Sequence, residues 1–184
     1  MEIYRIESDY AYKLLSGKDD ATIGKFYHYK GQSLVNQWEP PIFLLLENAS
    51  KLREERLSEK HKKDNRDAAC HGNIFLLKEK FMSALHSLPI QGLPVVTEGL
   101  LEKFVFINVL TILPAINFEG LDYHQSMKMV KEKDIKFSRE AISHHILFRD
   151  QKLINNYYCT EQFKRLINHH AIKGLHFDKV GTAM

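Results

Sequence analysis

Phe104–Ile112 is a nearly continuous apolar run, broken only by Asn108 and Thr111, which is typical of a buried β-strand. Successive side chains of a strand point to opposite faces, so Phe104 and Phe106 share one face and Val105 and Ile107 share the other. Both faces are largely apolar, which is typical of a strand that is covered on both sides. We therefore expect Phe104–Ile112 to be a central strand of the fold.

Weaker patterns predict further elements. Residues 2–7 alternate as an opening strand, Ile42–Leu46 is a short apolar strand or buried turn, and Asp122–Lys133 is a helix or loop. Turn residues between apolar runs also predict two hairpins. The first has arms Phe26–Tyr29 and Ser33–Trp38 around Lys30-Gly31, and the second runs from a strand at Ala141–Phe148 through the turn Asp150-Gln151-Lys152 to Ile154–Tyr158.

The chain also contains an internal repeat. Residues 73–95 align with residues 155–177 without a gap, and both copies predict the same strand–helix–turn–strand unit. The identical pairs are Asn73 and Asn155, Glu79 and Glu161, Phe81 and Phe163, Ile90 and Ile172, Gly92 and Gly174, and Leu93 and Leu175. The alternative is two unrelated amphipathic helices that happen to align.

Each copy predicts a helix, a glycine turn and a strand. In the first copy Leu77, Phe81, Leu85 and Leu88 recur at helical spacing as one apolar stripe, and the second copy has Cys159, Phe163, Ile167 and His170 at the equivalent places. Thr160 is the expected N-cap of the second helix. Gly92 and Gly174 then provide the permissive backbone that a chain needs to leave a helix. The strands Leu93–Val96 and Leu175–Val180 are predicted to follow.

The segment Ser50–Asp67 differs from the rest of the chain because charged residues dominate it. Basic and acidic residues mix, and only Leu52 and Leu57 are apolar. Opposite charges one helical turn apart stabilise a solvent-exposed helix, so we predict a charged helical insertion at residues 50–67, with a disordered excursion as the alternative. The acids nearly cancel the basic charge and no aromatic residue interleaves, which favours a solvated insertion over a nucleic-acid contact.

Length and composition fit one folded domain over residues 1–184. The chain is 44% hydrophobic and 27% charged with a net charge of +3, so nothing in it requires a polyanionic partner. No apolar run is long enough to span a bilayer, and no membrane partner is expected. The opening residues have neither the basic start nor the apolar stretch of a signal peptide, which predicts a cytoplasmic location.

The residues that usually carry chemistry form no recognisable motif. His144-His145 and His169-His170 are adjacent pairs, but neighbours on a strand point apart, and no CxxC or HxxxH pair fixes two ligands on one face. Nucleophile motifs and phosphate-binding glycine loops are missing as well. Cys70 and Cys159 are predicted to be reduced core residues. We therefore expect no catalytic residue, no metal site and no cofactor, and we predict that the chain is not an enzyme.

Three segments carry a resemblance to a known family. They are the opening Met1–Asp9, the central Phe106–Thr111, and the C-terminal stretch through Ile146–Arg149, Thr160–Phe163 and Gly174–Phe177. Their order resembles the immunity proteins of bacterial polymorphic toxin and type VI secretion effector systems, in a family first catalogued as a domain of unknown function. The sequence departs from that pattern at Pro114 and Asn117, where an acidic residue is commoner, and in the charged insertion.

The predicted strands and helices together indicate an α+β domain with mixed, mostly antiparallel sheets. The resemblance implies a single-domain cytoplasmic protein that binds a cognate toxin or effector domain encoded nearby and neutralises it sterically. The toxin could be a nuclease, and a homodimer is left open. Tight protein interfaces rely on a few aromatic or Arg anchors within a polar rim. The candidate toxin-binding residues are Tyr27, Tyr29, Trp38 and Glu39. The alternative for each aromatic residue is an ordinary half-buried position in a sheet.

Two other classes of function stay open. A nucleic-acid-binding module would use Lys51–Arg66, and its affinity would fall steeply with salt. A hydrolase or metal-dependent enzyme would bring scattered histidines and carboxylates together by folding. The immunity hypothesis is preferred because it needs no catalytic motif.

Overall fold

Twelve strands and several short helices follow one another along residues 1–184, all of which the computed structural model describes. The strands are β1 (Glu2–Ser8), β2 (Leu15–Gly17), β3 (Ile42–Leu45), β4 (Ala68–His71), β5 (Ile74–Lys78), β6 (Ile90–Thr97), β7 (Phe104–Val109), β8 (Ile112–Leu113), β9 (Ile135–Phe137), β10 (Leu147–Asp150), β11 (Tyr158–Thr160) and β12 (Leu175–Ala183). The α-helices are α1 (Asp20–Phe26), α2 (Leu46–Ala49), α3 (Arg53–Lys60), α4 (Tyr123–Lys131), α5 (Arg139–Ile142) and α6 (Glu161–His169), and the 3-10 helices are η1 (Val35–Gln37) and η2 (Glu79–Leu85).

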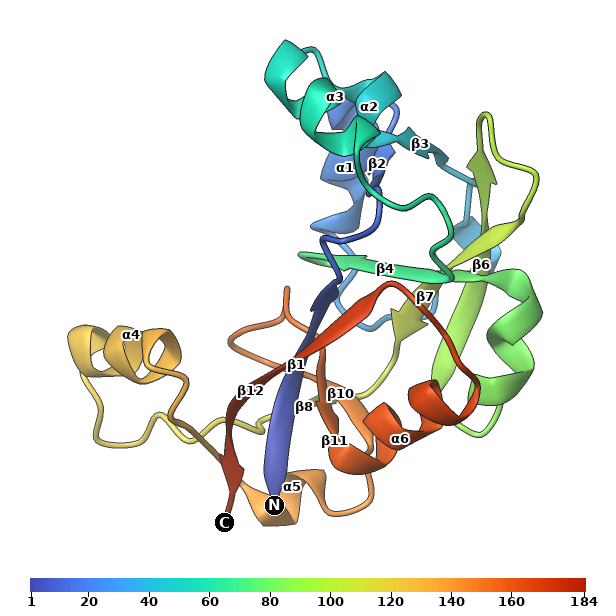
Figure 1. Ribbon diagram of the computed structural model, residues 1–184. Coiled ribbons are helices and arrows are strands. Elements are labelled where there is room, and N and C mark those ends of the chain that lie inside the picture. The colour runs from blue at the N-terminus through green and yellow to red at the C-terminus, as the bar shows by residue number, and fades with distance from the viewer.

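The strands form two six-stranded mixed sheets, which confirms the predicted α+β class (Figure 1). The β1 sheet has the order β8-β10-β11-β1-β12-β9, and the β7 sheet has the order β2-β3-β6-β7-β5-β4. Most pairings are antiparallel, and the parallel ones are β3–β6, β8–β10 and β9–β12. The predicted central strand is β7, in which every residue is buried.

The two sheets share a five-stranded pattern. Strand β7 lies between β5 and β6 and is antiparallel to both, as β1 is between β11 and β12. The hairpin β4–β5 corresponds to β10–β11, and the parallel pair β3–β6 corresponds to β9–β12. Residues 1–103 and 104–184 are therefore two equivalent halves, and the predicted repeat is one part of this larger duplication. Each half lends its first strand to the other half's sheet.

The register of the strands relates individual residues of the two halves. Leu77 pairs with Ala68 on one side and Val105 on the other, and Cys159 pairs in the same way with Leu147 and Tyr4. Leu77 and Cys159 are also aligned by the sequence repeat, so the repeat is real at this strand. Their predicted place on the helix stripe is wrong, because the helices begin only at Glu79 and Glu161. The register places Ala69 opposite Leu76 in the first half, where Phe148 stands opposite Tyr158 in the second.

The glycine turn of the repeat exists in the second half only. Gly174 has a φ of +101° and lies just before β12, as predicted. Gly92 lies inside β6, paired with Ile107 and without a positive φ, so its predicted role at a helix exit is wrong. The reason is that β6 begins at Ile90, whereas β12 begins at Leu175 and not at the aligned Ile172.

The two repeat helices also differ in detail. The first is the 3-10 helix η2, and the second is the α-helix α6. Thr160 occupies the N-cap position of α6, but its hydroxyl makes no capping hydrogen bond. His170 is exposed and does not belong to the buried stripe, because α6 ends at His169.

Both sheets and both repeat helices contribute to one central hydrophobic cluster. It contains Leu77 and Val105 from the β7 sheet, Tyr4 and Cys159 from the β1 sheet, and Leu85, Phe163 and Ile167 from the helices. Each sheet then has its own outer cluster, which includes Phe43 and Phe106 for the β7 sheet and Phe137 and Phe148 for the β1 sheet. Cys70 and Cys159 are buried in the central cluster, which confirms them as core residues.

Two strand predictions are wrong. Phe26–Tyr29 and Ser33–Trp38 do not form a hairpin, because Asp19 accepts a hydrogen bond from the Thr22 amide and starts helix α1, which continues to Phe26. The predicted strand Ala141–Phe148 is partly helix α5, since the Ser138 hydroxyl accepts from the Ala141 amide. The turn Asp150-Gln151-Lys152 is confirmed, and the Asp150 carboxylate accepts from the Lys152 and Leu153 amides.

The charged segment 50–67 contains helix α3, as predicted, but it is not simply solvated. Glu59 is 3% exposed and accepts a hydrogen bond from the Leu14 amide at 3.0 Å. Arg66 and Asp67 are also buried, and Asp67 pairs with Lys78 at 3.2 Å. The sequence predicted that these charged side chains face water. Glu59 and Asp67 instead attach this segment to the body of the protein.

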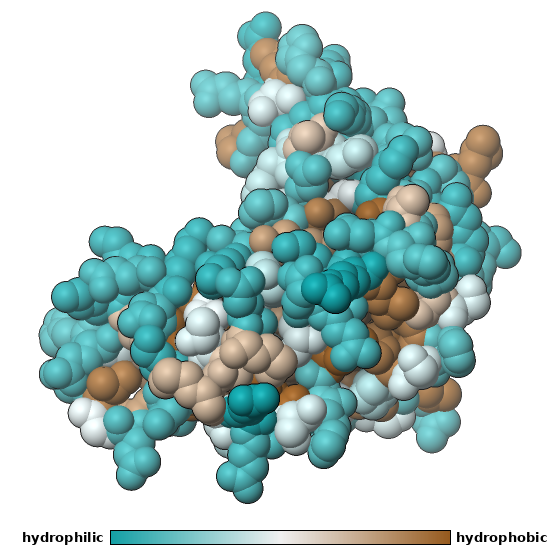
Figure 2. Space-filling model, turned by 60° about the horizontal axis from the view of Figure 1, so that its bottom comes forward, coloured by the Kyte–Doolittle hydropathy of each residue, from teal (hydrophilic) through white to brown (hydrophobic).

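Helices α4 and α1–α3 form two arms on the body (Figure 1). Hydrophilic residues predominate on both arms, and hydrophobic residues show in patches on the body between them (Figure 2). No helix combines the length and the apolar character that crossing a membrane requires.

Candidate functional site

The four predicted binding residues all lie between α1 and β3, on the outer face of the β7 sheet. Trp38 stacks on Phe106 with 5.6 Å between ring centroids, and its indole N–H donates to the Pro94 carbonyl at 2.7 Å. Tyr29 is half-buried beside Trp38, and burial raises the pKa of its phenol. Tyr29 and Trp38 therefore help to build the outer cluster, which is the alternative that the sequence left open.

Tyr27 and Glu39 are exposed instead. The Tyr27 residue is 57% exposed, and the Glu39 side chain is 87% exposed with its carboxylate 3.6 Å from the Lys25 ammonium group. Of the four predicted residues, Tyr27 alone lines a pocket. This pocket, the Tyr27 pocket, is the candidate functional site.

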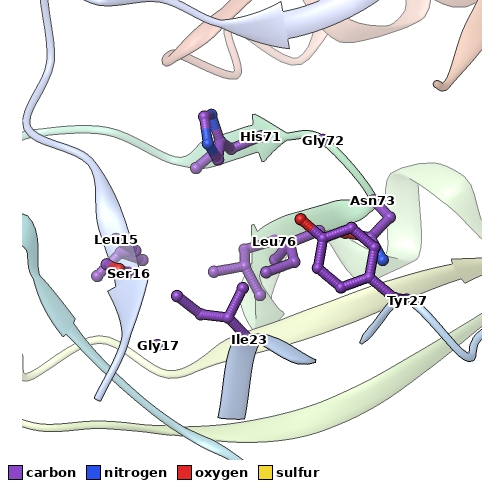
Figure 3. A pocket seen from close by; sticks show the side chains of 11 residues that line it. Leu15, Ser16, Gly17, Ile23, Tyr27, His71, Gly72, Asn73 and Leu76 are labelled. Carbon is purple, nitrogen blue, oxygen red and sulfur yellow. The ribbon is translucent and has the colours of Figure 1, made fainter. Parts of the chain in front are cut away.

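The Tyr27 pocket lies between β2, helix α1 and the hairpin β4–β5 (Figure 3). Its volume is about 170 Å³. Its lining residues are Leu15, Ser16, Gly17, Ile23, Tyr27, Ala69, His71, Gly72, Asn73, Ile74 and Leu76. Most of the lining is apolar, and the polar groups are the hydroxyls of Ser16 and Tyr27, the His71 imidazole and the Asn73 amide.

The pocket is open because of a small residue on β4. Ala69 lines the pocket, and the strand register places it where Phe148 stands in the second half. Phe148 is fully buried in the outer cluster of the β1 sheet, where its ring packs against Phe137 and Tyr158. The methyl group of Ala69 cannot fill the corresponding space under α1.

One polar group of the pocket has no partner within the chain. Asn73 is 4% exposed, and its side-chain nitrogen Nδ2 makes no hydrogen bond. Its backbone carbonyl is fixed, because the Tyr157 hydroxyl donates to it at 2.8 Å. A buried donor without an acceptor is rare in folded proteins and costs free energy.

Polar side chains of the second half hold the loop that follows Tyr27. The Asn108 amide donates to the Gln32 carbonyl at 2.8 Å and to Gln91 Oε1 at 3.0 Å. Arg149, from the second half, donates to the Tyr29 carbonyl at 2.9 Å. Burial lowers the pKa of the Arg149 guanidinium, which lies over the Tyr157 ring. The binding face is thus positioned by residues that are distant in sequence.

Sequence reasoning missed the hairpin residues His71, Gly72 and Asn73. The signal was present, since Gly-Asn between two apolar runs is a typical two-residue hairpin turn, and Gly72 has the positive φ of +55° that such turns need. No such signal exists for the pocket itself, because Ala69 and Tyr27 are brought together only by the packing of α1.

The other chemistry-bearing residues form no metal or thiol site. No group of three or more His, Cys, Asp or Glu side chains could hold a metal ion. His169 and His170 are neighbours at the end of α6, with ring centroids 5.1 Å apart. Burial raises the pKa of both the Cys70 and the Cys159 thiols.

Comparison with known proteins adds no relative to this picture. No protein-family model matches the chain, and no curated protein sequence matches it. The Tyr27 pocket therefore has to be interpreted from its own geometry.

Proposed function

We propose that this chain is a cytoplasmic immunity protein, which binds a cognate toxin domain through the face around the Tyr27 pocket and blocks it sterically. The observation that carries the proposal is an apolar pocket with an exposed tyrosine at its rim. Tyrosine is enriched in protein interfaces, because its ring offers contact area and its hydroxyl a hydrogen bond.

The surroundings of the pocket fit a protein interface. Charged residues occur on the elements that form it, and they pair with partners elsewhere: Lys18, next to the lining residue Gly17, lies 2.8 Å from Glu98, and Lys25 of α1 lies 3.6 Å from Glu39. An apolar centre with a polar rim is the usual anatomy of a tight interface.

The rigidity of the face favours tight binding as well. Asn108 and Arg149 hold the loop after Tyr27 in place before any partner arrives. A preorganised surface loses little conformational entropy on binding, so more of the contact energy is available for affinity. An inhibitor that acts by covering a site depends on such affinity.

The resemblance to immunity proteins supplies the class of partner, and co-expression tests it. The toxin is expected to be the product of a gene next to that of this chain. Producing that protein alone should stop growth, producing both should restore it, and the two should elute together from gel filtration. A harmless neighbour, or a pair that separates on the column, would contradict the proposal.

Two matched tyrosine variants locate the binding face. Tyr27→Ala should weaken the complex by about tenfold or more, as expected for an aromatic anchor. Tyr123→Ala is the control, because Tyr123 is 74% exposed on the separate arm formed by α4. Equal affinities for the two variants would place the interface elsewhere on the molecule.

A further inference from the structure

We infer that the Tyr27 pocket binds a carboxylate, the side chain of an aspartate or glutamate of the partner. This inference rests on the proposed function and specifies the chemistry of the contact. The second half of the molecule is the basis for it, because a buried carboxylate occupies the corresponding place there. The first half has no carboxylate at that place, and hydrogen-bond donors line the open space.

The carboxylate of the second half belongs to Asp150. Its Oδ2 atom accepts hydrogen bonds from the backbone amides of Ala115 and Ile116 at 2.9 Å each. Asp150 is 1% exposed, and the two amides stabilise a charge that would otherwise be costly to bury. Asp150 thus joins β10 to the segment that lies beside β9, where Ile116 stands opposite Phe137.

The register of the hairpins gives the counterpart of Asp150 in the first half. Asp150 lies two residues after Phe148 on β10, and His71 lies two residues after Ala69 on β4. Because Ala69 corresponds to Phe148, His71 corresponds to Asp150. His71 is exposed and lines the Tyr27 pocket. The pocket therefore opens where the second half holds its buried carboxylate.

The backbone amides that bind Asp150 have a counterpart as well. Gly17 of β2 stands opposite Phe43 of β3, as Ile116 stands opposite Phe137 of β9. The next amide, that of Lys18, donates to a β3 carbonyl. In an antiparallel pair, residues that bond to the neighbouring strand alternate with residues whose N–H points away. The Gly17 N–H therefore points away from β3, and Gly17 lines the pocket together with His71.

The side chains at the rim complement a carboxylate. Ser16 and Tyr27 lie on opposite sides of the pocket, and His71 lies between them (Figure 3). Tyr27 and His71 are exposed and Ser16 is half-buried, so a ligand can reach all three. Both hydroxyls can donate, and the imidazole donates through at least one ring nitrogen whether it is neutral or charged. No Asp or Glu lines the pocket, so it favours an anion over a cation.

The second half also provides the variant that tests this inference. His71→Asp places a carboxylate where Asp150 stands in the second half, and the chain should still fold because His71 is exposed. The new carboxylate should bind the Gly17 amide and exclude an external one. His71→Asn has nearly the same shape without the charge. His144→Asp is the control, because it makes the same change of charge at an exposed position of the second half.

The probe is propionate, titrated into the whole protein and followed by NMR, with propionamide as its neutral counterpart. Propionate should shift the Gly17 backbone amide and the His71 ring signals, with a dissociation constant on the order of millimolar for so small a ligand. Propionamide should shift neither at the same concentration.

The variants should rank by charge. In His71→Asp the affinity for propionate should fall about tenfold or more, because a second carboxylate in one site is repelled by the first. In His71→Asn it should fall about threefold, in line with one altered hydrogen bond. His144→Asp should bind propionate as wild type does.

The outcomes separate this inference from the proposed function. Propionate shifts that map outside the pocket, equal shifts with propionamide, or unchanged propionate binding by a folded His71→Asp variant overturn the inference. A toxin that binds wild type and His71→Asp equally well also overturns it, while the immunity function stands. Propionate binding in the pocket together with a neighbouring gene product that never binds supports the carboxylate site and overturns the immunity function.

Discussion

Residues 1–103 and 104–184 build the same five-stranded pattern, and each half gives its first strand to the sheet of the other. Their outer layers differ. In the second half the ring of Phe148 is buried in the outer cluster of the β1 sheet. In the first half the smaller Ala69 stands at the corresponding position, and the Tyr27 pocket stays open beside it. The duplicated residues build the scaffold, and the proposed binding site lies where the two halves have diverged.

The exchanged strands also make the two halves dependent on each other. Strand β1 pairs through Ile3 with Thr160 and through Ser8 with Leu175, so the β1 sheet cannot form until both ends of the chain meet. Contacts between residues so distant in sequence slow folding. We therefore expect the domain to unfold as one cooperative unit and neither half to fold alone.

The largest expected effect tests the filled outer layer. Phe148→Ala should lower the free energy of unfolding by about 3–5 kcal/mol, because it removes a fully buried ring and leaves a cavity. Ala69→Phe, the reciprocal change, should alter it by no more than about 1 kcal/mol, because the space already exists. Denaturation by urea measures both, and a large loss in Ala69→Phe would show that the two positions are not equivalent.

The two aligned glycines provide the next comparison. Gly174→Ala should cost about 2–4 kcal/mol, because of its positive φ and because a Cβ there would approach the Ala68 carbonyl oxygen to 2.3 Å. In Gly92→Ala the added carbon meets only the flexible end of Met82, so the cost should stay below about 1 kcal/mol. Equal costs in thermal or urea unfolding would mean that both glycines serve the same turn after all.

The buried arginines of the two halves should respond in opposite ways. Arg149→Met should cost about 2–3 kcal/mol, because it leaves the Tyr29 and Ile154 carbonyls without their donor. Arg66 is 3% exposed with Nη1 and Nη2 unpartnered, and burial lowers its pKa to about 10. Arg66→Met should therefore leave stability unchanged or raise it by about 1 kcal/mol. The same urea titration checks the pair, and a destabilised Arg66→Met would reveal a hidden partner.

The smallest expected effect concerns the unpartnered amide. Asn73→Leu should raise the free energy of unfolding by up to about 1 kcal/mol, because it removes a buried donor without an acceptor. Asn155→Leu, at the aligned position of the second half, is the control and should bring no gain because Asn155 is exposed. A loss of stability in Asn73→Leu would show that its amide is satisfied in the folded protein.

Local patterns predicted the fold class, the central strand β7 and the alignment of the two repeat copies, but they placed Leu77 and Cys159 on helices instead of strands. They could not reveal the whole duplication, because Ile3-Tyr4-Arg5 and Phe104-Val105-Phe106 share no residue although their strands are equivalent. The exchange of β1 and β7 between the two sheets also depends on pairing between distant strands, which local sequence patterns do not show. The ungapped alignment also misassigned Gly92, since the second half enters its last strand later.

The candidate site was only partly predictable. Tyr27 was among the expected binding residues, but Tyr29 and Trp38 belong to the packing of α1 on β7. The predicted strand Phe26–Tyr29 is absent, because helix α1, which is capped by Asp19, extends to Phe26. The pocket depends on the pairing of Ala69 with Leu76 and on the comparison with Phe148, and neither can be read without the strand register.

The most direct test is the dissociation constant between this chain and the product of the neighbouring gene, measured by calorimetry for wild type, Ala69→Phe and Tyr123→Ala. If the partner docks in the Tyr27 pocket, Ala69→Phe binds about tenfold or more weakly and Tyr123→Ala binds as wild type does. Equal affinities for wild type and a folded Ala69→Phe variant would contradict the account.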